Sequence, residues 1–163
     1  LVNLKKKIGN IKLPGLNSKM QEISAIVGNY NLQNFKKTLK KRMRVVNKFK
    51  NFFAYFENKK IFSLMKVDPS VDCTYLYFPI LVHKKINKFK KHLQKSNISF
   101  RKYYTAVHSL DFYKKEKKIT LKLDLRFTNK IKNKVIALPV FSDMTIKEIN
   151  YIFGKINQFY KVL

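Results

Sequence analysis

LQNFKKTLKKRMRVVNKFKNFFAYF, residues 32–56, carries the strongest helical pattern in the sequence. Its apolar side chains recur every three or four residues, which is the spacing of one face of an α-helix. They are Leu32, Phe35, Leu39, Met43, Val46, Phe49, Phe53 and Phe56. Lysines and arginines fill most intervening positions, so we expect a long helix with an apolar face against a core. The cationic face is either solvated or in contact with RNA.

A shorter helical pattern precedes this stretch. It begins near Ser18, with Asn17 or Ser18 as N-cap and Gln21 completing a capping box. Gly28 and Asn29 interrupt the pattern, which predicts two helices with a bend or a close approach between them. The apolar residues of the first helix are Met20, Ile23, Ile26, Val27 and Tyr30. We expect a larger domain or a partner subunit to cover this face.

The remaining sequence alternates between extended and helical patterns. Extended segments are predicted at Tyr75–Val82, Ile98–Tyr104, Ile119–Leu125 and Val135–Val140. Pro79 inside the first of these indicates an edge strand or a bulge, because proline lacks the N–H of a ladder bond. Helices are predicted at Lys85–Lys95, ending in a turn at Asn97, and from Thr145 onward, where Glu148 completes a capping box. The order predicts an α+β fold (a small α/β layer) with helices packed on one small sheet.

Charge is the unusual feature of the composition. Lys and Arg number 36 against 9 Asp and Glu, a net charge of +27 in 163 residues. Such a surplus favours an anionic partner: nucleic acid, a membrane surface or a phosphorylated small molecule. A coding sequence biased toward Lys, Asn, Ile, Phe and Tyr accounts for part of it. The bias does not account for the scarcity of Glu.

No complete catalytic constellation is found. Cys73 is the single cysteine, which excludes an internal disulfide and a cysteine metal cluster, and the three histidines are scattered. We therefore expect no metal site and no catalytic residue in this chain. The longest apolar run is far shorter than the roughly 20 residues of a membrane helix, and a cytoplasmic location is expected.

Two segments carry groups suited to anions. Phe100–Tyr104 places Arg101 and Lys102 beside Tyr103, with His108 close behind; these groups suit a phosphate, a carboxylate or a nucleobase. The loop at residues 15–20 leads into a helix N-terminus, whose free N–H groups and dipole attract anions, and Lys19 adds charge. In the first segment packed tyrosines and solvated cations are the simpler interpretation. The second segment is less specific, because many helices begin with a loop of this kind.

These two segments and the C-terminal region together resemble the DegT/DnrJ/EryC1/StrS aminotransferases. The first part of the resemblance is the pattern Gly15-x-Asn17-x-Lys19-Met20-x-Glu22 and its continuation. The strand region at residues 74–82 and the block at residues 97–104 followed by His108 are also similar. The closing motif is Leu-Pro, Met-Thr and Glu in residues 138–148. The resemblance spans residues 5–160 in the order of the family.

The resemblance implies a C-terminal part of an enzyme that uses pyridoxal 5'-phosphate (PLP) to aminate keto sugars on nucleotide carriers. It implies a small C-terminal domain at residues 17–163, including a helical segment at 18–56, after a linker at 1–16. The implied cofactor contacts are Asn17 and Lys19, reaching across a homodimer. The implied substrate contacts are Arg101, Tyr103 and His108.

The family's Schiff-base lysine belongs to the domain upstream of this segment, so the chain is not expected to be active alone. Lys19 and Asn97 replace the family's Arg and Gly. The resemblance further implies a role in polysaccharide biosynthesis. A small, basic, ribosomal-type RNA-binding protein is the alternative that the charge supports. A peripheral membrane protein is a third, although no segment is more typical of a membrane surface than of a core.

Overall fold

The long helix α1 runs from Glu22 to Asn58 in a computed structural model that describes residues 19–102, 105–115 and 124–161. The predicted division into two helices at Gly28 and Asn29 is therefore wrong. A Cβ placed on Gly28 would meet nothing within 4 Å, so no close approach requires glycine there. Glycine within a helix costs about 1 kcal/mol relative to alanine, which a helix of 37 residues accommodates.

The chain divides into two compact units, residues 1–35 and residues 36–163, and each is described by itself. In the first unit, the apolar side chains that the sequence placed on one helix face are exposed. Met20 is 77% exposed and Ile23 is 75% exposed. The other exposed members are Ile26, Val27 and Tyr30. Leu32 and Phe35, which the sequence placed on the core-facing side of the following helix, are also exposed, so that part of the prediction is wrong. The expectation that this face needs a cover from outside these residues is consistent with this exposure.

The second unit contains a four-stranded antiparallel sheet with the order β1-β2-β4-β3. Its strands are β1 (Phe62–Leu64), β2 (Phe78–Val82), β3 (Arg101–Lys102) and β4 (Val135–Leu138). Together with the helices, this sheet confirms the α+β class.

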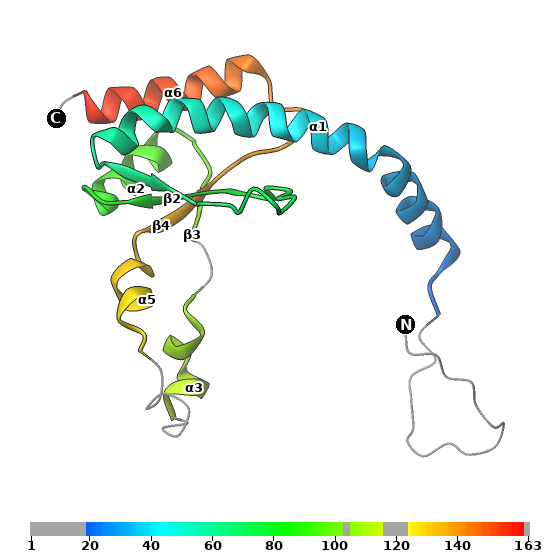
Figure 1. The fold of residues 1–163 in the computed structure, drawn as a ribbon, viewed down its shortest axis with the longest axis horizontal. Coiled ribbons are helices and arrows are strands. Elements are labelled where there is room, and N and C mark those ends of the chain that lie inside the picture. Colours follow the sequence, from blue (N-terminus) through cyan, green and yellow to red (C-terminus); the bar gives the residue numbers. More distant parts are fainter. Residues whose placement is uncertain (1–18, 103–104, 116–123, 162–163) are drawn as a thin grey trace. The chain divides into compact units, whose positions relative to one another are not determined.

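Three helical segments of the second unit cover one face of the sheet (Figure 1). They are the later part of α1, α2 (Ile86–Lys95) and α6 (Ile146–Tyr160). The rings of Phe52 on α1 and Phe153 on α6 stack with centroids 3.9 Å apart. Phe53 contacts Phe62 and Phe78 of the sheet. An aromatic core therefore joins both helices to this face.

Pro79 lies in an interior strand and in unbroken register with β4, so both the predicted edge position and the predicted bulge are wrong. Pro79 pairs with Ala137 of β4, whereas the pairing of β1 with β2 begins only at Ile80. Because β1 does not extend alongside Pro79, the missing N–H of proline deprives no partner strand of a hydrogen bond. Tyr75 is also outside the strand; its φ of 46° is incompatible with extended backbone.

Several smaller predictions are confirmed. α2 follows Lys85, and Asn97 adopts a left-handed conformation with φ 52°. β4 lies within the predicted extended segment. α6 begins after the N-cap Thr145. Its hydroxyl accepts a hydrogen bond from the Glu148 N–H at 3.2 Å, while the Glu148 carboxylate accepts one from the Thr145 N–H at 2.7 Å.

The region between β3 and β4 differs most from the prediction. It contains the short 3-10 helix η1 (Val107–Ser109) and the helices α3 (Asp111–Lys115) and α5 (Arg126–Ile131), none of which was predicted. Most of the predicted strand Ile119–Leu125 lies outside the described residues. Its last residue, Leu125, is the N-cap of α5 and not part of a strand. β1 was also missed. None of the described helices is long and apolar enough to cross a membrane.

Candidate functional site

Three of the five predicted site residues lie within the described part of the chain. Lys19 belongs to the first unit, where it is exposed three residues before α1. Arg101 and His108 belong to the second unit. Asn17 and Tyr103 lie outside the described residues.

Arg101 is held by a tyrosine from another strand region. Its Nη1 donates a hydrogen bond of 2.7 Å to the phenol oxygen of Tyr77, and its guanidinium lies 5.3 Å from the centre of the same ring. Arg101 is exposed and Tyr77 is half-buried. The pair therefore presents an oriented cation at the surface of the second unit.

The sheet register explains how these two residues meet. Pro79 pairs with Ala137, and Ala137 pairs with Arg101, so the three residues form one row across the sheet. Side chains directly opposite each other lie on the same face, and residues two apart along a strand share that face. Tyr77 precedes Pro79 by two residues. The Arg101 side chain thus reaches Tyr77 across Ala137, which is only 2% exposed.

His108 is bonded to a residue of α5. Its Nε2 lies 2.9 Å from the side-chain oxygen of Asn129. An amide oxygen only accepts hydrogen bonds, so Nε2 is the donor, and in the neutral ring Nδ1 is left as an acceptor. His108 could therefore accept a hydrogen bond from a substrate hydroxyl through Nδ1.

The other two histidines have separate partners. His83 Nε2 lies 2.7 Å from the hydroxyl of Ser63, and His92 Nε2 lies 2.9 Å from the backbone oxygen of Lys155. Among the described residues, no carboxylate is bonded to His83 to orient it as a base for Ser63. No group of three or more metal-ligating side chains occurs among the described residues.

Lysines flank the same edge of the sheet as Arg101. Partial burial of Lys90 lowers the pKa of its ammonium group, and the nearby charge of Lys102 lowers it further. Lys90 Nζ donates to the backbone oxygen of Asn133 at 3.4 Å. This edge therefore carries a concentration of positive charge, which an anion would relieve.

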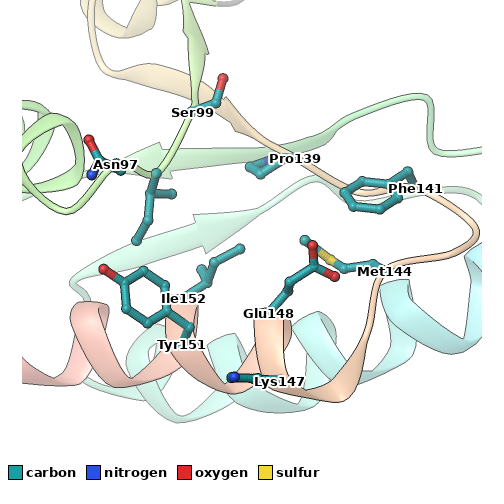
Figure 2. Close-up of a pocket in the computed structure, with 10 residues that line it drawn as sticks. Asn97, Ser99, Pro139, Phe141, Met144, Lys147, Glu148, Tyr151 and Ile152 are labelled. Atoms are coloured by element: carbon teal, nitrogen blue, oxygen red, sulfur yellow. The ribbon is translucent and has the colours of Figure 1, made fainter.

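An apolar cavity of about 480 Å³ lies between α6 and the segments that flank β3 and β4 (Figure 2). Figure 2 shows Ile152 and Glu148 rising from α6 toward Pro139, with Tyr151 on the side of Asn97. The Glu148 carboxylate there is already engaged by Thr145. The cavity thus offers apolar surface with few free polar groups.

Two residues of this site were not found by sequence reasoning, namely Tyr77 and Asn129. The pairing of Tyr77 with Arg101 depends on sheet register, which local pattern does not give. Asn129 lies on α5, for which no helical pattern was recognised. The position of Tyr77 directly before a buried strand was a sequence signal that could have identified it. No comparable signal in the sequence pointed to Asn129.

Residues 2–157 match the model of the DegT/DnrJ/EryC1/StrS aminotransferase family, and the chain belongs to that family. The curated relative from Escherichia coli, dTDP-4-amino-4,6-dideoxy-D-glucose transaminase, is 28% identical over 155 residues. The match covers 89% of this chain and 40% of the relative. A relative of the same name from Shigella dysenteriae is 26% identical, with 91% and 40% covered.

Solved structures show the same fold. A DegT DnrJ EryC1 StrS aminotransferase from Brucella abortus superposes with a TM-score of 0.78 at 18% identity, covering 96% of this chain and 40% of that one. The aminotransferase PseC of Helicobacter pylori, involved in the biosynthesis of pseudoaminic acid, gives 0.73 at 18% identity, covering 98% and 43%. This chain therefore spans about 40% of the length of the relatives it matches.

Proposed function

We propose that the chain is the C-terminal part of a PLP-dependent aminotransferase that transfers an amino group to a keto sugar on a nucleotide carrier. The observation that carries the proposal is the family match over residues 2–157. The names of the relatives support it, since they describe transaminases of nucleotide-linked or other sugars. In this proposal residues 17–163 form the small domain of a fold-type I enzyme, and residues 1–16 link it to a preceding large domain.

The residues at the start of α1 suit the phosphate of PLP. Lys19 is exposed three residues before Glu22. The free N–H groups of a helix N-terminus and a nearby ammonium group attract a phosphate dianion. Asn17 and Lys19 would hold that phosphate across a homodimer. A related structure solved in its PMP form supports the cofactor class. When bound, PLP supplies an electron sink for amino transfer.

The second unit would bind the nucleotide sugar. Arg101 carries a permanent charge and can form paired hydrogen bonds with a diphosphate oxygen. His108 would accept a hydrogen bond from a sugar hydroxyl, and Tyr103 would be a further substrate-binding residue. The catalytic lysine would be supplied by the preceding domain, so this chain binds and orients while the preceding domain carries out the bond-making steps. We further propose a cytoplasmic enzyme of polysaccharide biosynthesis.

The RNA-binding alternative is not favoured, because the family match extends over almost the whole chain. The charge of +27 is then compatible with binding of phosphorylated substrate and cofactor.

The test uses the longest open reading frame that contains these 163 residues. Its product is purified with PLP and incubated with a dTDP-4-keto-6-deoxy sugar and a panel of amino acids. Mass spectrometry should show replacement of the keto oxygen by an amino group. The proposal would be refuted if the reading frame encoded no lysine-bearing PLP domain. It would also be refuted if the purified protein converted no nucleotide keto sugar.

A further inference from the structure

Tyr77 contacts Arg101, and the proposed function assigns no role to this tyrosine. We propose that Tyr77 is a positioning residue, which holds the guanidinium of Arg101 in the orientation that binds the diphosphate of a nucleotide. This inference rests on the proposed function for its choice of ligand. The role of Tyr77 itself is inferred from the geometry of the Arg101–Tyr77 pair.

Arg101 needs an external support because of where it lies. β3 contains only two residues, Arg101 and Lys102, and both are exposed. A free arginine side chain at such an edge populates many rotamers, and ordering it on ligand binding costs entropy. The bond of 2.7 Å to Tyr77 and the contact of 5.3 Å with its ring restrict those rotamers in advance. Preorganisation of this kind increases affinity without adding a contact to the ligand.

The chemistry of the support leaves the cation available. A phenol oxygen accepts a hydrogen bond but carries no charge at neutral pH, so it orients the guanidinium without neutralising it. Among the described residues, the ion pairs are Lys41–Asp143 and Arg126–Asp124, and neither involves Arg101. Within the described ranges, Nη1 is the guanidinium nitrogen for which a hydrogen bond is found. The remaining N–H groups can form the paired hydrogen bonds that arginine makes with phosphate oxygens.

Ala137 allows the contact to form. It lies between Pro79 and Arg101 in the row across the sheet. Since side chains of one row share a face, a larger residue at position 137 would lie in the path of the Arg101 side chain. Its burial to 2% exposure is consistent with a cover formed by the arginine and the tyrosine.

The experiment measures binding of thymidine diphosphate to the full-length protein by calorimetry. Tyr77→Phe removes the phenol oxygen and keeps the ring. It should weaken binding by roughly three- to tenfold, the effect of losing one hydrogen bond. Tyr55→Phe is the matched control, because Tyr55 is also a half-exposed ring with a lysine, Lys59, 4.5 Å from its centre. The control should bind as the wild type does.

A second comparison separates positioning from a general structural role. In the background of Arg101→Ala, the additional change Tyr77→Phe should have no further effect, because its partner is absent. In the amino-transfer assay, Tyr77→Phe should raise KM and leave kcat within twofold. Equal losses of affinity with and without Arg101, or an unchanged dissociation constant for Tyr77→Phe, would overturn the inference.

The outcomes also separate this inference from the proposed function. If the wild type transfers amino groups and the Tyr77→Phe variant binds the diphosphate normally, the proposed function stands and the role of Tyr77 is refuted. If the wild type binds the diphosphate through Arg101 and Tyr77 but converts no keto sugar, the proposed function is refuted and the positioning role of Tyr77 stands. Failure of the wild type to bind the diphosphate overturns the role of Tyr77, whatever its activity.

Discussion

Nε2 of His108 lies 2.9 Å from the side-chain oxygen of Asn129, and this contact joins η1 to α5. Because the amide oxygen can only accept, the contact fixes the neutral imidazole as the tautomer protonated at Nε2. We expect Asn129→Ala to give a mixture of tautomers, visible in long-range ¹⁵N–¹H NMR spectra of His108. The signals of His83, which contacts Ser63, should not change. An unaltered His108 spectrum would show that Asn129 does not set the tautomer.

Arg101→Ala should raise the KM for the nucleotide sugar by at least about tenfold, because hydrogen bonds to charged groups contribute about 1.5–3 kcal/mol. Arg101→Lys should recover only part of this loss, since an ammonium group lacks the planar fork of arginine. Steady-state kinetics of the full-length enzyme test this, with Arg44→Ala, an exposed arginine on α1, as control. An unchanged KM would remove Arg101 from the substrate site.

Asn17→Ala should weaken cofactor binding, because an amide that contacts the phosphate of PLP would be lost. The dissociation constant can be measured by absorbance titration of the apoenzyme. Asn34→Ala serves as control, since the Asn34 side chain donates to the backbone oxygen of Tyr30 within α1. Equal affinity of Asn17→Ala and wild type would refute the Asn17 assignment.

Phe49→Ala should lower the free energy of unfolding by about 3–5 kcal/mol, as is typical for loss of a buried aromatic ring. Phe49 is 0% exposed, and its ring contacts Phe78 of the sheet and Phe153 of α6. Tyr55 lies on the same helix and is 57% exposed, so Tyr55→Ala should cost under about 1 kcal/mol. Urea unfolding measures both. Similar losses in the two variants would contradict the described core.

Thr145→Ala should destabilise the protein by about 1 kcal/mol, because it removes the N-cap of α6. Hydrogen bonds from the Thr145 side chain and backbone lower the pKa of Glu148 below its ordinary value of 4.5. Because the pKa is lowered in the folded state, the contribution of the ionised Glu148 carboxylate to stability is complete above that ordinary value. It is lost as the pH falls through the folded-state pKa. The difference between wild type and Thr145→Ala should therefore narrow below about pH 4.5. A difference in unfolding free energy that does not change with pH would show that the Glu148 carboxylate does not contribute to the cap.

The sequence predicted the elements whose signals are local. The spacing of Val46, Phe49 and Phe53 placed the buried face of the later part of α1 correctly, because residues three and four apart lie on the same side of a helix. The pair Thr145 and Glu148 placed the start of α6, since both hydrogen bonds of a capping box are made within four residues.

The errors arose where distant residues decide the structure. Pro79 was assigned to an edge because proline lacks a donor, yet the length of β1 rather than the order of strands frees its nitrogen. β1 itself has only three residues and carries no alternation that could be recognised. The Arg101–Tyr77 contact was missed for the same reason: it depends on how both strands pair with β4.

The strand order also constrains when the fold can be completed during synthesis. β1 and β2 can form a pair as soon as both have left the ribosome. Among the described strands β3 pairs with β4, which follows it by more than thirty residues of chain. β4 must then pair with β2 on one side and β3 on the other. Until Leu138 has emerged, the edge of β2 is open, so a nascent chain stalled before that residue would expose an unpaired apolar strand to chaperones or to other nascent chains.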